Sequence, residues 1–237
     1  MKRKLSELIA ARVPPVPPGT AAIGGTWSPV NYLDAYLRSA RILVDKAESE
    51  DMLDDLAVAV VYQQRHSLEL MLKDVLLGIY EIVDLKKQLA EDSGKTYTGF
   101  EPTAGALKRV DTGHRLSALL IDLEHAIAQT KRQGLPADLR ALVADFEAIE
   151  AGEPTRFRYE RVPGRSLPSG KHGPLQRSFP VRVHIDIRGF QTRLEGISAA
   201  LFRFSKEDAT ETASIGEDIY LETNWLMTEL YGRGLLE

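Results

Sequence analysis

Four ionisable side chains lie within nine positions of an otherwise apolar stretch, residues 62–76 (YQQRHSLELMLKDVL). They are Arg65, His66, Glu69 and Lys73, and steps of three and four residues place them on one face of a helix. We expect Glu69 to be the hub, bonded to Arg65, Lys73 or His66. Two interpretations are open: a ladder of charges that satisfies itself at the edge of a core, or the polar wall of a cleft between helices.

A second candidate for chemistry is His114, which the pattern places in the first turn of a helix that Asp111 or Thr112 begins. The positive end of the helix dipole disfavours imidazolium there, so a neutral ring could act as a base or as a hydrogen-bonded cap. The sequence has no phosphate loop, no nucleophile elbow and no pair of histidines at metal-ligand spacing on a helix. We therefore predict no metal and no cofactor.

Positive charge is concentrated in residues 156–193, which hold nine Lys or Arg against two acids, Glu160 and Asp186. This segment carries +7, and because the whole chain carries −4, the remainder carries −11. One interpretation is a local site for a polyanion. The other is a solvated loop whose arginines pair with the acidic remainder.

Within the basic segment, residues 179–187 (FPVRVHIDI) alternate between apolar and polar side chains, which is typical of a strand. Arg182 and His184 fall on the polar face. We predict residues 156–162 (RFRYERV) as the partner strand, and residues 163–178, which include Arg177, as a mobile loop rich in Gly, Pro and Ser. Arg158 and Tyr159 would lie on the partner strand, where an arginine beside an aromatic ring suits a phosphate and a stacked base.

The elements that would position these side chains are mostly helical, with apolar residues at steps of three and four. A helix capped at Ser28 should precede a long helix over residues 54–89, with a possible break near Gly78. After a polar loop (91–106), the pattern predicts helices from about residue 111, after the GLP at 134–136, around residues 190–204, and over residues 216–231. The predicted class is mainly α, with about six helices and one small β-hairpin.

Residues 1–27, with the sequence VPPVPPG at 13–19, are predicted to form a Pro-rich N-terminal arm, and residues 28–237 a single helical domain with the basic hairpin inserted at about 156–187. The apolar residues of one helix form a seam like that of a coiled coil: Phe190, Leu194, Ile197, Leu201 and Phe204. From this seam we predict a homodimer. No cysteine, secretory signal or membrane-spanning run is present, which favours the cytoplasm.

Several of these segments together resemble HEPN-like helical proteins, a superfamily common in bacterial toxin–antitoxin and phage-defence systems. YQQRHSLELMLKDVL is similar to their helix with the pattern hydrophobic–Arg–His–x–Leu/Ile–Glu–Leu–x–Leu–Lys. GHRLSALL resembles the short His-led helix start, and FRYE resembles Phe-Arg-Tyr-Pro with Glu160 in place of proline. VHIDIRGFQTRLEGISAALFRF resembles the strand that leads into the last helix, so the likeness covers roughly residues 28–205.

The resemblance implies a helical bundle that binds RNA or a nucleotide, often as a dimer and with a partner protein encoded nearby. The resemblance and the charge of the basic segment together predict a ligand site at Arg65, His66, Lys73, His114, Arg158, Tyr159, Arg177, Arg182 and His184. Catalytic members cleave RNA without metal, using an Arg followed four to six residues later by a His. Three such pairs occur here, Arg109–His114, Arg165–His172 and Arg177–His184, and none begins at Arg158.

The function predicted from the sequence is RNA or nucleotide binding in a bacterial defence or toxin-type system. One alternative is a non-catalytic helical module for dimerisation or interaction, in which the polar ladder is structural. A second alternative is a metal-independent endoribonuclease, for which His66, His114 and Arg158 are the catalytic candidates.

Overall fold

The structure is a computed structural model that describes residues 32–151, 153, 156–159, 161–164, 173–202 and 214–235. It places the described part from Tyr32 onward in one compact unit. The prediction of a mainly α fold is confirmed, because seven helices and one two-stranded sheet make up the described elements. The predicted N-terminal arm and the cap at Ser28 lie outside the described residues.

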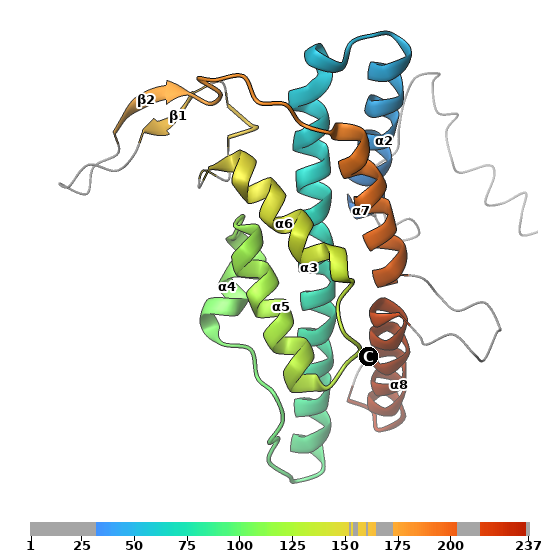
Figure 1. Ribbon diagram of the computed structural model, residues 1–237. Helices are drawn as coiled ribbons and strands as arrows, with labels where there is room; N and C mark the ends of the chain where they lie inside the picture. The colour runs from blue at the N-terminus through green and yellow to red at the C-terminus, as the bar shows by residue number, and fades with distance from the viewer. Residues whose placement is uncertain are drawn as a thin grey trace, which may run out of the picture. The chain divides into compact units, whose positions relative to one another are not determined.

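A single long helix, α3 (Leu53–Asp92), is the element on which the others assemble (Figure 1). It contacts α2 (Tyr32–Ser49), α4 (Ala104–Thr112), α5 (Leu116–Thr130), α7 (Ile187–Phe202) and α8 (Ile215–Gly232). Helix α6 (Ala137–Glu150) packs on α5 and α7. The apolar side chains of α3 point to several faces because it has neighbours on several sides.

The main core gathers side chains from all these helices around the middle of α3, among them Leu68, Leu72, Leu119, Phe146 and Leu194. A second cluster joins the last turns of α3 to α8 through Ile82, Leu85, Leu226 and Leu230. No helix in the described part of the chain is both long and apolar enough to cross a membrane.

The predicted break of the long helix at Gly78 is wrong, since α3 runs without interruption to Asp92. The glycine has a different role, because it allows α8 to approach closely. A Cβ atom at position 78 would lie 2.6 Å from Cγ2 of Ile219 on α8, which is closer than two carbon atoms can approach.

The helix predicted from about residue 111 corresponds to α5, and a separate helix that was not predicted, α4, precedes it. Thr103 caps α4, with its hydroxyl accepting a hydrogen bond from the Ala106 N–H at 3.1 Å, so part of the predicted 91–106 loop is helical. Helix α5 begins only at Leu116, with Arg115 as its N-cap. His114 therefore lies in the link between the two helices and not in a first helical turn.

The hairpin also lies elsewhere than predicted. Strands β1 (Arg161–Gly164) and β2 (Gly173–Arg177) pair antiparallel, with Arg161 opposite Arg177, so β2 falls in the stretch predicted as a loop. Residues 181–186 form no strand, and Val181 is 73% exposed. In the described part of the chain, no strand lies beside the alternating segment to bond its backbone, and the residues around Arg156, which were predicted as its partner, form a turn.

The seam on α7 packs inside the protein's own core. Phe190, Leu194, Ile197 and Leu201 are all buried against other helices of the same chain, and Phe204 lies outside the described residues. These side chains are therefore not available to pair α7 with a second copy, so the basis on which the homodimer was predicted is wrong.

Candidate functional site

The ladder on α3 is a buried ionic network. Nε of Arg65 donates to Oε1 of Glu150 on α6 at 2.6 Å, and the other two nitrogens of this guanidinium bond the Glu69 carboxylate and the backbone carbonyl of His114. Arg65 is 2% exposed. Because all three nitrogens are satisfied, this buried charge is tolerated.

Glu69 is the hub of this network, as predicted. Besides Arg65, its carboxylate bonds Lys73 at 3.0 Å and Nδ1 of His114 at 2.9 Å. Burial alone would raise the pKa of Glu69, but the charge of Arg65 and the hydrogen bonds from His114 and Lys73 outweigh it and lower the pKa to about 2. Glu69 is therefore ionised at neutral pH.

Glu150 shares Arg65 with Glu69 but behaves differently. Burial raises its pKa, and the attraction of Arg65 only partly opposes this, since the neighbouring charges of Glu147 and Glu69 act with burial. The sequence interpretation missed Glu150 as a partner. The sequence does contain a signal for it: Glu150 lies four residues after Phe146, so it shares the buried face of α6, and an acid buried there needs a cationic partner.

From Glu150 the network continues to the base of the hairpin. Nε of Arg156 donates to the Glu150 carbonyl at 2.7 Å, and a second nitrogen of Arg156 bonds the carbonyl of Ser178. The Ser178 hydroxyl in turn donates to the carbonyl of Tyr159. These bonds fix residues 156–159 against residue 178, so the network on α3 supports the segments that carry Arg158, Tyr159 and Arg177.

His66 does not join this network and faces α2 instead. Its ring stacks on Tyr62, with centroids 5.9 Å apart and an interplanar angle of 5°, and meets Tyr36 edge-on at 4.4 Å. The guanidinium of Arg158 lies over the ring of Tyr62, 5.7 Å from its centroid. Burial lowers the pKa of His66; the charge of Glu69 opposes this effect and the charge of Arg158 adds to it, so the net shift favours the neutral form of the ring.

Five side chains around the hairpin form what we call the basic surface: Arg158, Tyr159, Arg177, Arg182 and His184. All five are exposed, Tyr159 by 59%. They border two cavities, of about 400 and 560 Å³. Both cavities share an apolar wall of Val58, Phe157 and Phe179, so the basic surface continues from one cavity to the next.

The arginines of the basic segment divide into two groups. Arg188 pairs with Asp45 and Glu48 on α2, and Arg193 pairs with Asp138 and Asp145 on α6, so for these two the internal-pairing interpretation is right. No carboxylate among the described residues pairs with Arg158, Arg177 or Arg182. The side chains of Arg161, Arg165 and Lys171 lie outside the described part, as does His172.

The structure thus places the predicted site residues in three environments. Arg65 and Lys73 are engaged by Glu69 inside the molecule, while His66 and His114 lie at its edge, with the His114 side chain 41% exposed. The remaining residues form the basic surface. In the Arg109–His114 pair, one of the three Arg–His pairs in the sequence, the guanidinium of Arg109 donates to both carboxylate oxygens of Asp122, at 2.6 and 2.7 Å.

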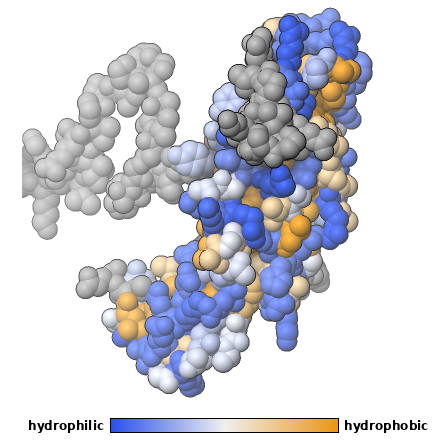
Figure 2. Space-filling view, turned by 90° about the vertical axis from the view of Figure 1, so that its left-hand side faces the viewer, coloured by the Kyte–Doolittle hydropathy of each residue, from blue (hydrophilic) through white to orange (hydrophobic). Residues whose placement is uncertain are grey.

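Three further observations bear on function. No group of three His, Asp or Glu side chains among the described residues could hold a metal ion. Hydrophilic residues predominate on the face in Figure 2, where hydrophobic ones form separate patches.

No family model, no curated protein and no solved structure matches the chain.

Proposed function

We propose that this protein binds RNA or a nucleotide on the basic surface. The observation that carries the proposal is that Arg158, Arg177 and Arg182 are exposed and have no carboxylate partner among the described residues. Arginines that are free of internal ion pairs are available to phosphate oxygens, which they bind in a charge-assisted, bidentate manner.

The surroundings of these arginines suit the rest of a nucleotide. Tyr159 and His184 present exposed rings on which a base can stack. The wall of Val58, Phe157 and Phe179 offers an apolar surface to the flat face of a base. The resemblance to HEPN-like proteins, whose ligands are RNA or nucleotides, agrees with this chemistry. A role in a defence or toxin-type system, and a partner protein, rest on that resemblance alone.

The proposal is tested by fluorescence anisotropy with a short labelled oligouridine, and by competition with ATP. The test variant replaces Arg158, Arg177 and Arg182 with Ala. Its matched control replaces Arg38, Lys108 and Arg140, three exposed cations outside the basic surface, and so removes the same charge. We expect the test variant to bind roughly tenfold more weakly than the control. Equal affinities of the two variants would remove the basic surface from the site.

A metal-independent endoribonuclease is the second candidate, favoured by the pairing of His114 with Glu69. Because Glu69 is ionised, its carboxylate accepts a hydrogen bond from Nδ1–H of His114, which assigns the ring proton to Nδ1 and leaves Nε2 of the partly exposed ring able to accept a proton. A carboxylate that orients a histidine in this way is a recurrent arrangement in general-base catalysis. The test is incubation of labelled RNA with a chelator: cleavage should occur with the wild type and be lost in His114→Ala. Intact RNA with the wild type would contradict this candidate.

A further inference from the structure

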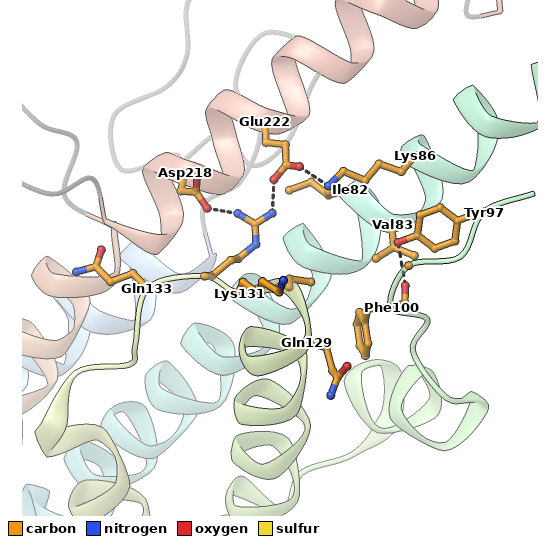
Figure 3. Close-up of a pocket in the computed structure, with 13 residues that line it drawn as sticks. Ile82, Val83, Lys86, Tyr97, Phe100, Gln129, Lys131, Gln133, Asp218 and Glu222 are labelled. Atoms are coloured by element: carbon orange, nitrogen blue, oxygen red, sulfur yellow. Dashed lines mark hydrogen bonds and ion pairs between the residues drawn. The ribbon is translucent and has the colours of Figure 1, made fainter. Parts of the chain in front are cut away.

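Figure 3 shows a further cavity, of about 510 Å³, which shares no lining residue with the two cavities at the basic surface. It is formed by the second half of α3, the segment 97–100, the end of α5 with the residues after it, and α8. Ile82 on its wall lies 24 positions after Val58 on the uninterrupted α3, a separation of about 36 Å at 1.5 Å per residue. Its volume falls in the range of sites for small molecules.

Most of the charge on the walls of this cavity is paired. Arg132, with its side chain only 5% exposed, bonds both Asp218 and Glu222 of α8, and Lys86 bonds Glu222 at 2.6 Å. Figure 3 shows these interactions as dashed lines at one side of the cavity. The two carboxylates are therefore occupied, and they do not repel an anion as free carboxylates would.

One cation on the walls is left over. Lys131 is exposed, and no carboxylate in the described part of the chain pairs with it. In addition, Nε of the buried Arg132 side chain has no hydrogen-bond acceptor among the described residues. The lining thus holds three cations against two carboxylates and keeps an excess of positive charge.

The other walls offer flat apolar surface and hydrogen-bond donors. Tyr97 and Phe100 lie together at one side of the cavity, where the Tyr97 hydroxyl donates to the Phe100 carbonyl at 3.1 Å (Figure 3). Gln129 and Gln133 are exposed, and neither amide is bonded to another described residue. Aromatic walls with a few polar groups are typical of sites for planar organic molecules.

We infer that this cavity is a binding site for a small aromatic carboxylate, with its carboxylate at Lys131 and its ring against Tyr97 and Phe100. The site is independent of the basic surface and of the function proposed for it. Lys131 supplies the charge that selects an anion, while the amides of Gln129 and Gln133 supply further donors for its oxygens.

The conformation of Lys131 provides an informative variant. Lys131 ends α5 in the left-handed region, with φ 56° and ψ 34°, where glycine is favoured over every residue with a Cβ. Lys131→Gly therefore removes the cation without imposing strain on the backbone, so the variant should fold as the wild type does. Lys108→Ala, which removes an exposed lysine of α4, is the matched control for charge.

The test is a fluorine NMR titration of the full chain with para-fluorobenzoate, and with the neutral para-fluorobenzamide as comparator. We expect saturable binding of the benzoate, with the amide weaker by roughly threefold or more, the effect of one exposed charge pair. Lys131→Gly should abolish this preference while Lys108→Ala keeps it, and Phe100→Ala should weaken both probes. Absence of saturation with the wild type, equal binding of the two probes, or an unchanged preference in Lys131→Gly would overturn the inference.

Discussion

At Glu69, burial and ion pairing have opposite effects on the pKa of the carboxylate, and the effect of ion pairing is the larger one. Arg65, Lys73 and His114 surround it, so the charged form is stabilised although the group is 1% exposed. Glu150, which has Arg65 but neither of the other two partners, keeps a raised pKa. The number of cationic and hydrogen-bonding partners therefore determines which of the two buried acids has the lower pKa.

Removing Glu69 should destabilise the protein strongly. Glu69→Ala leaves Arg65 and Lys73 without their shared carboxylate in a buried site, which typically costs about 3–5 kcal/mol. Glu124→Ala is the control, since Glu124 pairs with Arg140 at the surface and its loss should cost less than about 1 kcal/mol. Urea unfolding measures both values. Equal values for the two variants would contradict the burial of the network.

The contribution of Glu69 should also depend on pH in a defined direction. Its pKa is about 2 in the folded protein against 4.5 as the reference value, so between these values the unfolded chain binds the proton first. The difference in unfolding free energy between wild type and Glu69→Gln should be constant above about pH 4.5 and shrink as the pH falls toward 2. Glu150 is present in both proteins and largely cancels. A difference that stays constant down to pH 2 would show that Glu69 is not held in its charged form.

At the scale of elements, the close approach of α8 to α3 depends on the absence of a side chain at position 78. Helix α8 is fixed there by Ile219 against Gly78, by the second apolar cluster, and by the bonds of Arg132 and Lys86 to Glu222. A glycine inside a helix makes the helix less stable than an alanine would. At position 78, the close packing of Ile219 against the glycine offsets this loss.

Gly78→Ala should therefore destabilise the protein, although alanine favours helix formation. The new Cβ would overlap the branched side chain of Ile219, and such overpacking costs about 1–3 kcal/mol. Gly196→Ala on α7 is the control, because in the described part of the chain no atom outside the helix's own nearby backbone lies within 4 Å of a Cβ there, and it should stabilise by up to about 1 kcal/mol. Thermal unfolding distinguishes them; a gain at both positions would mean that α8 does not pack on Gly78.

The seam on α7 gives a further prediction at this scale. Leu194→Ala should lower the unfolding free energy by about 2–5 kcal/mol, because Leu194 is fully buried in the core of its own chain. If the seam instead joined two copies, the variant would keep its fold and shift the sedimentation equilibrium toward monomer. Sedimentation and urea unfolding of the same preparation separate the two outcomes.

The elements were predictable where a helix carries a long apolar stripe at steps of three and four residues, as in α2, α6 and α7. Helix α4 was missed because its nine residues bury only Ala106 and Val110, which is too short a stripe to recognise. The ladder of Arg65, Glu69 and Lys73 follows from spacing alone. Its partner Glu150 lies 85 positions from Arg65, so the pair depends on how α6 packs and not on local spacing.

At the scale of the whole molecule, the described arginines of the basic segment serve two purposes. Arg188 and Arg193 join α7 to acids on α2 and α6, whereas Arg156 fastens the hairpin base to the end of α6. Arg158, Arg177 and Arg182 are exposed and have no carboxylate partner among the described residues, although the guanidinium of Arg158 also lies over the ring of Tyr62. The excess of +7 in the sequence is therefore partly used in ion pairs and hydrogen bonds within the chain, and the three exposed arginines are the part that the proposed function assigns to a ligand.

The salt dependence of RNA binding tests the basic surface most directly, because phosphate contacts release counterions and neutral contacts do not. Affinity for a single-stranded RNA is measured at several salt concentrations for the wild type and for the variant with Ala at Arg158, Arg177 and Arg182. If each arginine binds one phosphate, the slope of log affinity against log salt should be shallower by about 2 in the variant, at roughly 0.7 per contact. Identical slopes in the two proteins would contradict the account.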